Sequence, residues 1–244
     1  MRKAKKQAGR PAKGTHGRYL SALTLFAGMM VIRVPTGKGK TTQLALSTRS
    51  CKSILIVVAR RALARSTTED YVRLGNNVEC YLDLPDGPIT AKRVVVCLDS
   101  LPRVALSEFD VVIIEESEST IGHIFGGTIP ETDRGGRPGR AKVFDTLRRV
   151  VSNTLEAGGT VIAADAYASN LTHNSLLALS SGTARPVLLR TIKMRASRVG
   201  LTVHKYAKAK HALAVATQMI RAGKRVILHF THRTQAAAFA KAAR

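Results

Sequence analysis

A short run of small and basic residues has the composition and spacing of a phosphate-binding loop. Residues 31–42 read VIRVPTGKGKTT and end in Gly39, Lys40 and Thr41. Glycines let the backbone turn tightly, so that successive N–H groups point inward toward anionic oxygens. The lysine of such a loop reaches the β- and γ-phosphates, and the hydroxyl that follows it can bind Mg²⁺. The segment therefore predicts a nucleotide site with Mg²⁺ as a cofactor.

One position departs from the usual G-x-x-x-x-G-K-S/T pattern, because Val34 stands in place of the first glycine. Pro35 and Thr36 can open the turn instead, since a proline has no N–H to continue a strand ladder. A basic glycine-rich turn without a function is the alternative. We expect the phosphate contacts to come from the whole loop, which consists of Pro35, Thr36, Gly37, Lys38, Gly39, Lys40, Thr41 and Thr42.

The second candidate is an acidic pair, Glu115 and Glu116, which follows the aliphatic run 111–114. A phosphoryl-transfer site needs acids at the end of a strand to hold Mg²⁺ and to orient the attacking water. We expect Glu115 to share the metal with Thr41, and both glutamates to be catalytic, with Glu116 acting on the water. Asp110 lies at the wrong end of that strand. A solvated acidic start of a helix is the alternative, since the helix dipole favours one.

Apolar runs that alternate with helical patterns predict how these residues are positioned. Strands are expected at 29–34, 53–58, 94–98, 111–115, 161–164 and 187–190, and helices at 40–49, 60–75 and 140–159. Such alternation predicts a parallel sheet with covered faces and a ligand at the carboxyl ends of its strands. The fold class is therefore α/β, a P-loop NTPase with a parallel sheet covered by helices.

The chain is expected to divide into a basic tail at 1–17, an ATP-binding domain at 18–190, a linker at 191–200 and an incomplete second domain at 201–244. The tail has six Lys and Arg and no acid, a composition typical of disorder. From residue 201 the pattern predicts one strand, a helix at 208–224 and a second strand at 225–230. Those elements cannot build a covered sheet alone, so the second domain is expected to be truncated.

The charge of the chain favours a polyanionic partner. In 244 residues, 39 Lys and Arg oppose 16 Asp and Glu, which gives a formal charge of +23. Such a field favours nucleic acid first and an anionic membrane second. No apolar run approaches the roughly 18 residues of a membrane span, so we expect no membrane partner and a cytoplasmic location. The three cysteines, Cys51, Cys80 and Cys97, are too widely spaced for a zinc ribbon or a disulfide framework.

The order of these elements resembles the superfamily 2 DEAD-like helicases. Within them it is similar to the origin-binding-protein helicases of herpesviruses and to related plasmid and phage replication proteins. The segment RYLSALTLFAGMMVIRVPTGKGKTTQLA resembles their phosphate-loop motif, and DVVIIEESEST resembles their DExx motif. ILIVVARRALARS resembles motif Ia, VVVCLDSLPRV the next motif, GGTVIAADAY motif III and KRVILHFTHRTQAAAFAKA motif IV. The resemblance covers about residues 18–244.

This resemblance implies two RecA-like domains and an ATP-dependent helicase or translocase that works in DNA replication. Single-stranded DNA is the expected partner, and replication proteins are further candidates. Arg60, Arg61, Ser66 and Ser100 would lie near single-strand phosphates, and Asp165 would couple hydrolysis to domain movement. A viral member of this class would work in the cytoplasm or nucleus of its host.

Two departures from the family pattern leave other functions open. Glu115 replaces the metal-holding aspartate of the family and is one methylene longer, which is expected to shift Mg²⁺ and slow turnover. The later motifs, including an arginine finger, have no counterpart before Arg244, so a truncated motor is expected. The alternatives are another P-loop enzyme, such as a nucleoside kinase or GTPase, and a non-catalytic DNA-binding protein with a degenerate ATP site.

Overall fold

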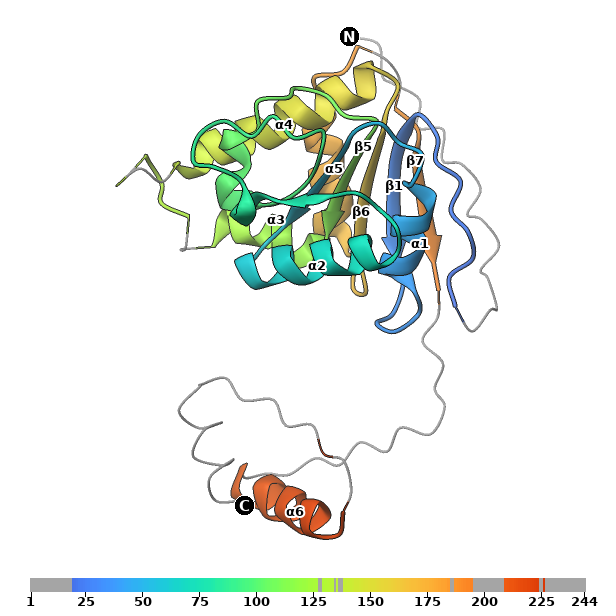
Figure 1. The fold of residues 1–244 in the computed structure, drawn as a ribbon, viewed down its shortest axis with the longest axis vertical. Coiled ribbons are helices and arrows are strands. Elements are labelled where there is room, and N and C mark those ends of the chain that lie inside the picture. The colour runs from blue at the N-terminus through green and yellow to red at the C-terminus, as the bar shows by residue number, and fades with distance from the viewer. Residues whose placement is uncertain are drawn as a thin grey trace. The chain divides into compact units, whose positions relative to one another are not determined.

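Seven strands that all run parallel form the centre of the first part of the chain (Figure 1). The structure is a computed structural model that describes residues 19–126, 129–133, 135, 138–184, 187–194, 209–223 and 226. The chain divides into two units, 1–196 and 197–244, and the sheet belongs to the first. The basic tail at 1–17 lies outside the described residues.

The strands are short, and the central ones are mostly apolar. They are β1 (Gly28–Arg33), β2 (Ile54–Val58), β3 (Glu79–Cys80), β4 (Arg93–Cys97), β5 (Val111–Glu115), β6 (Thr160–Asp165) and β7 (Leu189–Lys193). Every residue of β2, β5 and β6 is buried, as expected for parallel strands that are covered on both faces. The order in the sheet is β3-β4-β2-β5-β6-β1-β7, so the central strands carry the core and β7 lies at one edge.

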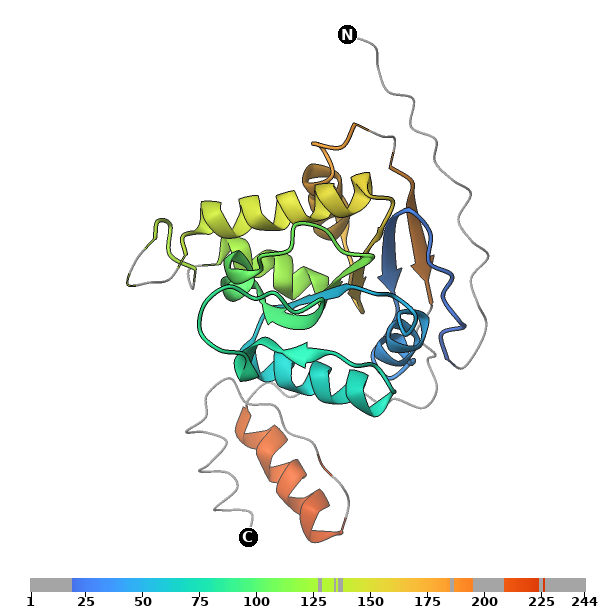
Figure 2. The ribbon, with the colours of Figure 1, turned by 45° about the horizontal axis from the view of Figure 1, so that its top comes forward.

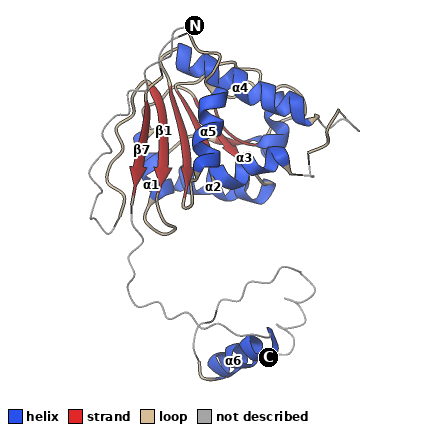
Figure 3. Ribbon diagram, turned by 180° about the vertical axis from the view of Figure 1, so that it is seen from behind, coloured by secondary structure: helices blue, strands red, loops and turns tan. Residues whose placement is uncertain are grey.

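Helices cover both faces of this sheet. They are α1 (Lys40–Ser47), α2 (Arg61–Arg73), α3 (Ser117–Phe125), α4 (Arg140–Glu156) and α5 (Asn170–Leu179), with the 3-10 turns η1 (Tyr81–Asp83) and η2 (Leu98–Arg103). Figures 1 and 3, seen from opposite sides, show α1 and α2 over one face and α4 and α5 over the other. Figure 2 shows strands between α4 and α2. Right-handed crossovers explain this division. From β1 to β3 the chain moves across the sheet in one direction, and after β3 it moves in the other, so the connecting helices lie on opposite faces.

The strand register brings the two candidate motifs to one edge of the sheet. β6 lies between β1 and β5, with Arg33 opposite Asp165 and Glu115 opposite Ala164. The loop after β1 and the acids after β5 therefore emerge at the same carboxyl edge, one strand apart. Asp110 lies at the amino end of β5, where its carboxylate accepts hydrogen bonds from the backbone N–H groups of Lys52 and Ser53. The predicted position of Asp110, at the other end of this strand from the two glutamates, is confirmed.

Most of the predicted elements are present, and the differences are local. The strand expected at 187–190 is β7, which pairs with β1 from Leu189 to Lys193. The sheet thus continues past residue 190, and the segment expected to be a linker from residue 191 begins inside a strand. No pattern in the sequence indicated β3, η1, η2 or α5, and α3 was considered only as an alternative interpretation of the acidic pair. The helices expected at 40–49, 60–75 and 140–159 are confirmed as α1, α2 and α4.

The second unit contributes one described helix, α6 (Ala209–Arg221), which confirms the helix expected at 208–224. Its Ala216 is buried, whereas its Gln218 and Met219 are exposed. The strands expected at 201–207 and 225–230 lie outside the described residues, apart from Val226. Among the helices described in both units, none is long and apolar enough to cross a membrane.

We expect Gly159→Ala to lower the free energy of unfolding by about 1–3 kcal/mol, because overpacking forces the backbone to move. A Cβ at Gly159 would lie 2.6 Å from the carbonyl oxygen of Phe109 and 2.8 Å from Cγ2 of Thr154. Denaturant unfolding of both proteins measures the difference. Gly122→Ala in α3 is the matched control, since its Cβ would meet open space and alanine favours a helix. Equal decreases in the two variants would contradict this account.

Candidate functional site

The phosphate loop after β1 has the conformation that its glycines predict. Gly37 and Gly39 have φ values of 76° and 80°, in the left-handed region that favours glycine. Helix α1 follows at once, with the Gln43 N–H donating to the Gly39 carbonyl at 2.9 Å. No acidic residue lies in the first turn of α1, so its N-terminus keeps its full positive potential. The loop can therefore cradle an anion with backbone N–H groups.

Val34 explains why the first glycine of the usual pattern is unnecessary here. Its side chain is fully buried in the core, and its N–H donates to the Asp165 carbonyl at 3.1 Å. Val34 thus continues the end of β1, and the turn begins with Pro35. The exposed part of the loop, Thr36 and Gly37, comes after that point.

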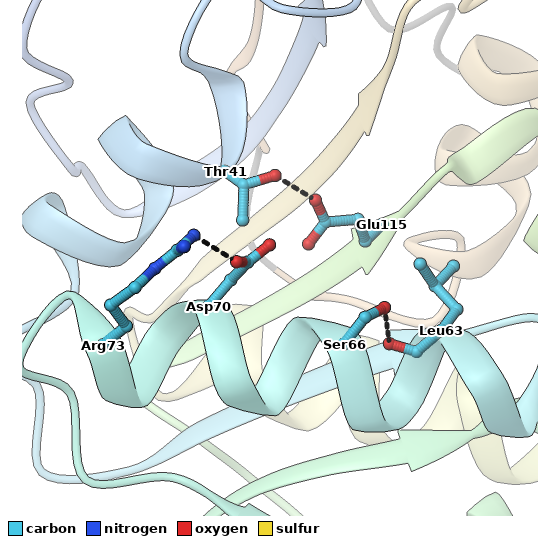
Figure 4. Close-up of polar contacts among 6 residues, drawn as sticks. All are labelled: Thr41, Leu63, Ser66, Asp70, Arg73 and Glu115. Atoms are coloured by element: carbon cyan, nitrogen blue, oxygen red, sulfur yellow. Dashed lines mark hydrogen bonds and ion pairs between the residues drawn. The ribbon is translucent and has the colours of Figure 1, made fainter. Parts of the chain in front are cut away.

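Thr41 and Glu115 meet across the carboxyl edge of the sheet. Thr41 Oγ1 donates to Glu115 Oε1 at 2.8 Å (Figure 4). Only 4% of Glu115 is exposed, and its Oε2 is buried without a hydrogen-bond partner among the described residues. Burial raises the pKa of Glu115 above its ordinary value, while the bond from Thr41 and the charge of Lys40 act in the opposite direction.

These oxygens fit a magnesium ion. Mg²⁺ prefers oxygen ligands and is usually held by one or two carboxylates together with substrate phosphates and waters. The unpartnered Oε2 of Glu115 and the hydroxyl of Thr41 supply that kind of donor. No group of three or more His, Cys, Asp or Glu that could hold a metal occurs in the described part of the chain. A metal at this site would therefore depend on the nucleotide for its remaining ligands.

Glu116 differs from Glu115 in burial and in backbone conformation. Its side chain is exposed, and its φ of 46° is the one positive value among the described non-glycine residues. Such a conformation costs about 1–3 kcal/mol and is typical of functional sites. The first turn of α3 holds it, because the Thr120 N–H donates to the Glu116 carbonyl and Thr120 Oγ1 donates to the Glu115 carbonyl. The two glutamates are thus fixed together, one inside the fold and one open to solvent.

Helix α2 supplies a third side of this site, which the sequence did not predict. Asp70 points toward the Thr41–Glu115 pair and forms an ion pair with Arg73 at 2.5 Å (Figure 4). The charge of Asp70 contributes to the raised pKa of Glu115. The hydroxyl of Tyr71 is buried without a partner among the described residues, and burial raises the pKa of that phenol, with the charge of Glu115 adding to it.

A network of hydrogen bonds connects α3 to the end of β6. The Glu118 N–H donates to Asp165 Oδ2 at 3.0 Å. The Glu118 carboxylate accepts from Ser169 and Thr172, through the backbone N–H and the hydroxyl of each. Burial acts to raise the pKa of Glu118, but these hydrogen bonds hold it below its usual value. Asp165, expected to be a coupling residue, is the last residue of β6 and therefore connects this strand to the helix after the acidic motif.

An exposed aromatic ring lies against the phosphate loop. Tyr19 is 57% exposed, and a Cβ at Gly39 would lie 3.9 Å from its Cδ1. The Leu20 N–H donates to the Lys38 carbonyl at 2.8 Å, which fixes this segment beside the loop. Tyr19 was not among the site residues predicted from the sequence. The RYL segment before the loop was the available signal, since an exposed aromatic ring can stack on a base.

A groove of about 1200 Å³ opens at the carboxyl ends of β2 and β4. Its lining includes cations, a hydroxyl and acids, which are Arg60, Arg61, Arg103, Lys142, Ser100, Asp86, Asp99 and Asp133. Three of the four predicted nucleic-acid residues are thus brought together there.

The fourth, Ser66, does not line this groove. It is exposed on α2, and its hydroxyl donates to the Leu63 carbonyl one turn earlier (Figure 4). Ser100 lies beside Tyr81, whose pKa is raised to about 12 by burial and by a hydrogen bond with Cys97, while a bond with Ser100 lowers it. Ser100 is therefore held in the wall of the groove.

We expect Glu115→Gln to raise the thermal stability of the ligand-free protein at neutral pH. The folded pKa of Glu115 lies above its ordinary value of 4.5, so the folded state binds more protons than the unfolded state between these two values. Stability is therefore lost as the pH rises through the raised pKa. A glutamine keeps an oxygen for the Thr41 hydroxyl but has no charge to bury.

Thermal unfolding between about pH 4 and about pH 8 tests the predicted loss of stability with rising pH. The increase in Tm of Glu115→Gln over the wild type should grow with pH. Glu116→Gln is the control, because the Glu116 side chain is exposed and its effect should stay small throughout. An increase that is the same at every pH would contradict the role assigned to the buried charge.

The sequence profile of a family described as "Origin of replication binding protein" matches residues 20–157, which is more than half of the chain. A replication origin-binding protein of Gallid herpesvirus 2 is 34% identical over 113 residues, which cover 41% of this chain and 13% of that protein. A protein of the same name from varicella-zoster virus (strain Dumas) is 32% identical over 107 residues, with the same two coverages. The chain thus spans 13% of the length of these relatives.

A solved structure of an S. cerevisiae Dbp5 variant bound to RNA and ADP BeF3 has a TM-score of 0.56 and 12% sequence identity. The match covers 88% of this chain and 56% of that chain. At this identity the likeness concerns the fold alone, and it confirms the RecA-like α/β class. With the phosphate loop, the acidic motif and the profile match in agreement, the resemblance seen in the sequence is confirmed, and the chain belongs to the origin of replication binding protein family.

Proposed function

We propose that this chain contains the ATP-binding motor domain of a nucleic-acid helicase or translocase that works in DNA replication. The observation that carries the proposal is the hydrogen bond from Thr41 to the buried Glu115, which joins the phosphate loop to the acidic motif. The names of the herpesvirus relatives support a role at replication origins. The helicase-like fold supports a motor.

Each residue of the nucleotide site has a distinct task in this proposal. The backbone N–H groups of the loop and the Lys40 ammonium bind the β- and γ-phosphates of ATP. Thr41 and Glu115 hold Mg²⁺, which neutralises phosphate charge when it is bound. Glu116 orients the attacking water and accepts its proton, since its carboxylate is exposed at the same edge of the sheet. The exposed ring of Tyr19, beside the loop, is available to stack on the base.

The groove at the carboxyl ends of β2 and β4 is the proposed path of a single strand of DNA. Arg60, Arg61 and Arg103 would contact its phosphates, and Ser100 would donate a hydrogen bond from the groove wall. The formal charge of +23 supports a partner with many phosphates. Both this groove and the nucleotide site lie at the carboxyl edge of one sheet, so ATP and DNA would bind to neighbouring parts of the same rigid element.

Asp165 is proposed to couple hydrolysis to movement. Its carboxylate accepts hydrogen bonds from the N–H groups of Glu118 and Tyr167, so it connects the acidic motif with the exposed loop after β6. A change at Glu116 during hydrolysis would pass to that loop through α3. Replication proteins are proposed as further partners, and a location in the host cytoplasm or nucleus follows only if the protein is viral.

A non-catalytic DNA-binding protein with a degenerate ATP site is the second candidate. Glu115 favours it, because the family has a shorter aspartate at that position and the extra methylene displaces the carboxylate. ATP hydrolysis that increases with added single-stranded DNA separates the two candidates, since the second requires none.

We expect Glu116→Gln to keep its affinity for Mg-ATP and to lose nearly all ATP hydrolysis, because an amide cannot accept the proton of the water. Lys40→Ala should instead bind ATP at least ~10-fold more weakly, since it removes a direct charge–phosphate contact. Equilibrium binding and phosphate release on the same preparations measure both effects. Hydrolysis that survives in Glu116→Gln would show that Glu116 is not the residue that accepts the proton of the water.

We expect the double change Arg60→Ala and Arg61→Ala to weaken binding of a single-stranded oligonucleotide and to flatten its salt dependence. On a single strand, the slope of log K against log salt becomes shallower by about 0.7 for each phosphate that the protein no longer neutralises. Arg148→Ala with Arg149→Ala is the matched control, because these are also consecutive exposed arginines but lie on α4 outside the groove lining. Similar slopes in the two double variants would rule out the groove as the DNA path.

A further inference from the structure

His123 joins α3 to η2 within the lining of the groove. Its Nε2 donates to Asp99 Oδ1 at 2.8 Å, since a carboxylate accepts hydrogen bonds. His123 belongs to α3, whereas Asp99 belongs to η2, the turn that also carries Ser100 and Arg103. The imidazole is 20% exposed, and both residues line the groove. The bond therefore joins the proposed DNA-binding turn to the helix that follows the acidic motif.

The other end of α3 is attached to the catalytic glutamates. Glu116 is the residue directly before this helix, and Thr120 binds the carbonyl oxygens of both glutamates, at 2.8 Å for Glu116 and 2.7 Å for Glu115. Between Thr120 and His123 the helix is continuous, and its Ile121 is buried in the core. A short helix held in this way moves as one piece, so a shift at His123 reaches the backbone of Glu116.

The backbone conformation of Glu116 depends on contacts with α3, so a movement of α3 can change it. A non-glycine residue at a φ of 46° is held by its surroundings rather than by its own preference. The hydrogen bond from Thr120 is one of the contacts that hold it, and the position of α3 determines that bond. A small displacement of α3 is thus sufficient to change how the Glu116 carboxylate is presented.

We propose that His123 is a positioning residue that transmits occupation of the groove by single-stranded DNA to Glu115 and Glu116 through the Asp99–His123 hydrogen bond and α3. Glu115, the proposed magnesium ligand, carries the change to Mg-ATP, because Thr120 of α3 binds its carbonyl oxygen. The inference rests on the proposed function, since it needs both ATP and DNA to bind. DNA phosphates that contact Ser100 and Arg103 move or stiffen η2, and Asp99 carries that change to His123. By reciprocity, ATP at the phosphate loop must change the affinity of the groove for DNA by the same factor.

The test measures this factor directly on the full chain. The affinity for Mg-ATP is determined with and without a saturating oligothymidylate strand, and the ratio is the coupling factor. We expect the oligonucleotide to tighten ATP binding of the wild type by about 5- to 150-fold. His123→Ala and Asp99→Ala should each bring the ratio close to one. Their affinities for ATP alone should stay within about threefold of the wild type.

Conservative variants distinguish loss of the Asp99–His123 hydrogen bond from a general defect in folding. His123→Gln and Asp99→Asn retain a donor and an acceptor, so each should recover part of the coupling factor. The double variant His123→Ala with Asp99→Ala should reduce the coupling no more than either single variant, because both remove the same bond. Asp83→Ala is the matched control, since it breaks the 3.1 Å ion pair of Asp83 with Arg65 between η1 and α2. That control should keep the wild-type ratio.

The outcomes distinguish this inference from the proposed function. A wild type that binds neither ATP nor the oligonucleotide overturns the proposed function and the inference with it. A wild type that binds both with a ratio of one overturns the inference alone. A wild-type ratio in His123→Ala also overturns it. So does a reduced oligonucleotide affinity in His123→Ala with the ratio unchanged, because His123 would then be a DNA contact rather than a link.

Discussion

The buried carboxylate of Glu115 is the constraint on which the arrangement of the site depends. A charged group inside a fold must be compensated, and Thr41 and Lys40 are the groups that favour its ionised form. They can do so only because β1 and β5 emerge at the same edge of the sheet with β6 between them. The unpartnered Oε2 shows that this compensation is incomplete among the described residues. The fold thus keeps an unsatisfied oxygen where a cation and phosphates are proposed to bind.

The parallel topology also explains why the groove lies close to the proposed nucleotide site. Arg60, Ser100 and other groove residues follow β2 and β4, and the proposed nucleotide residues follow β1 and β5, so polar residues of all four strands emerge at one edge. The strand β5, with its acidic motif, is the neighbour of β2. Helix α3 then runs from this motif to His123 in the groove. Proximity of the two sites is therefore a consequence of strand order and needs no additional domain.

The sequence predicted the elements whose signal is local. β5 was predicted at its observed bounds because four aliphatic residues stand directly before two acids. β7 was placed too early, because this edge strand is only half-buried and its apolar residues do not form a continuous run. Ser66 was grouped with the arginines from a motif resemblance, although the helical turn carries it away from them. The partners of Glu118 are 51 and 54 residues distant in the chain, and no periodicity reveals such contacts.

The contrast between Glu115 and Glu116 shows how adjacent residues of the same type acquire different chemistry. β5 directs Glu115 into the fold, where burial raises its pKa and its Oε2 has no hydrogen-bond partner among the described residues. The left-handed conformation of Glu116 ends the strand and leaves the next carboxylate exposed to solvent. An ordinary strand would also alternate the two side chains, but it would continue the sheet and leave no place for α3. The strained residue is therefore what lets one turn of chain supply a buried carboxylate, an exposed carboxylate and the start of the helix that reaches the groove.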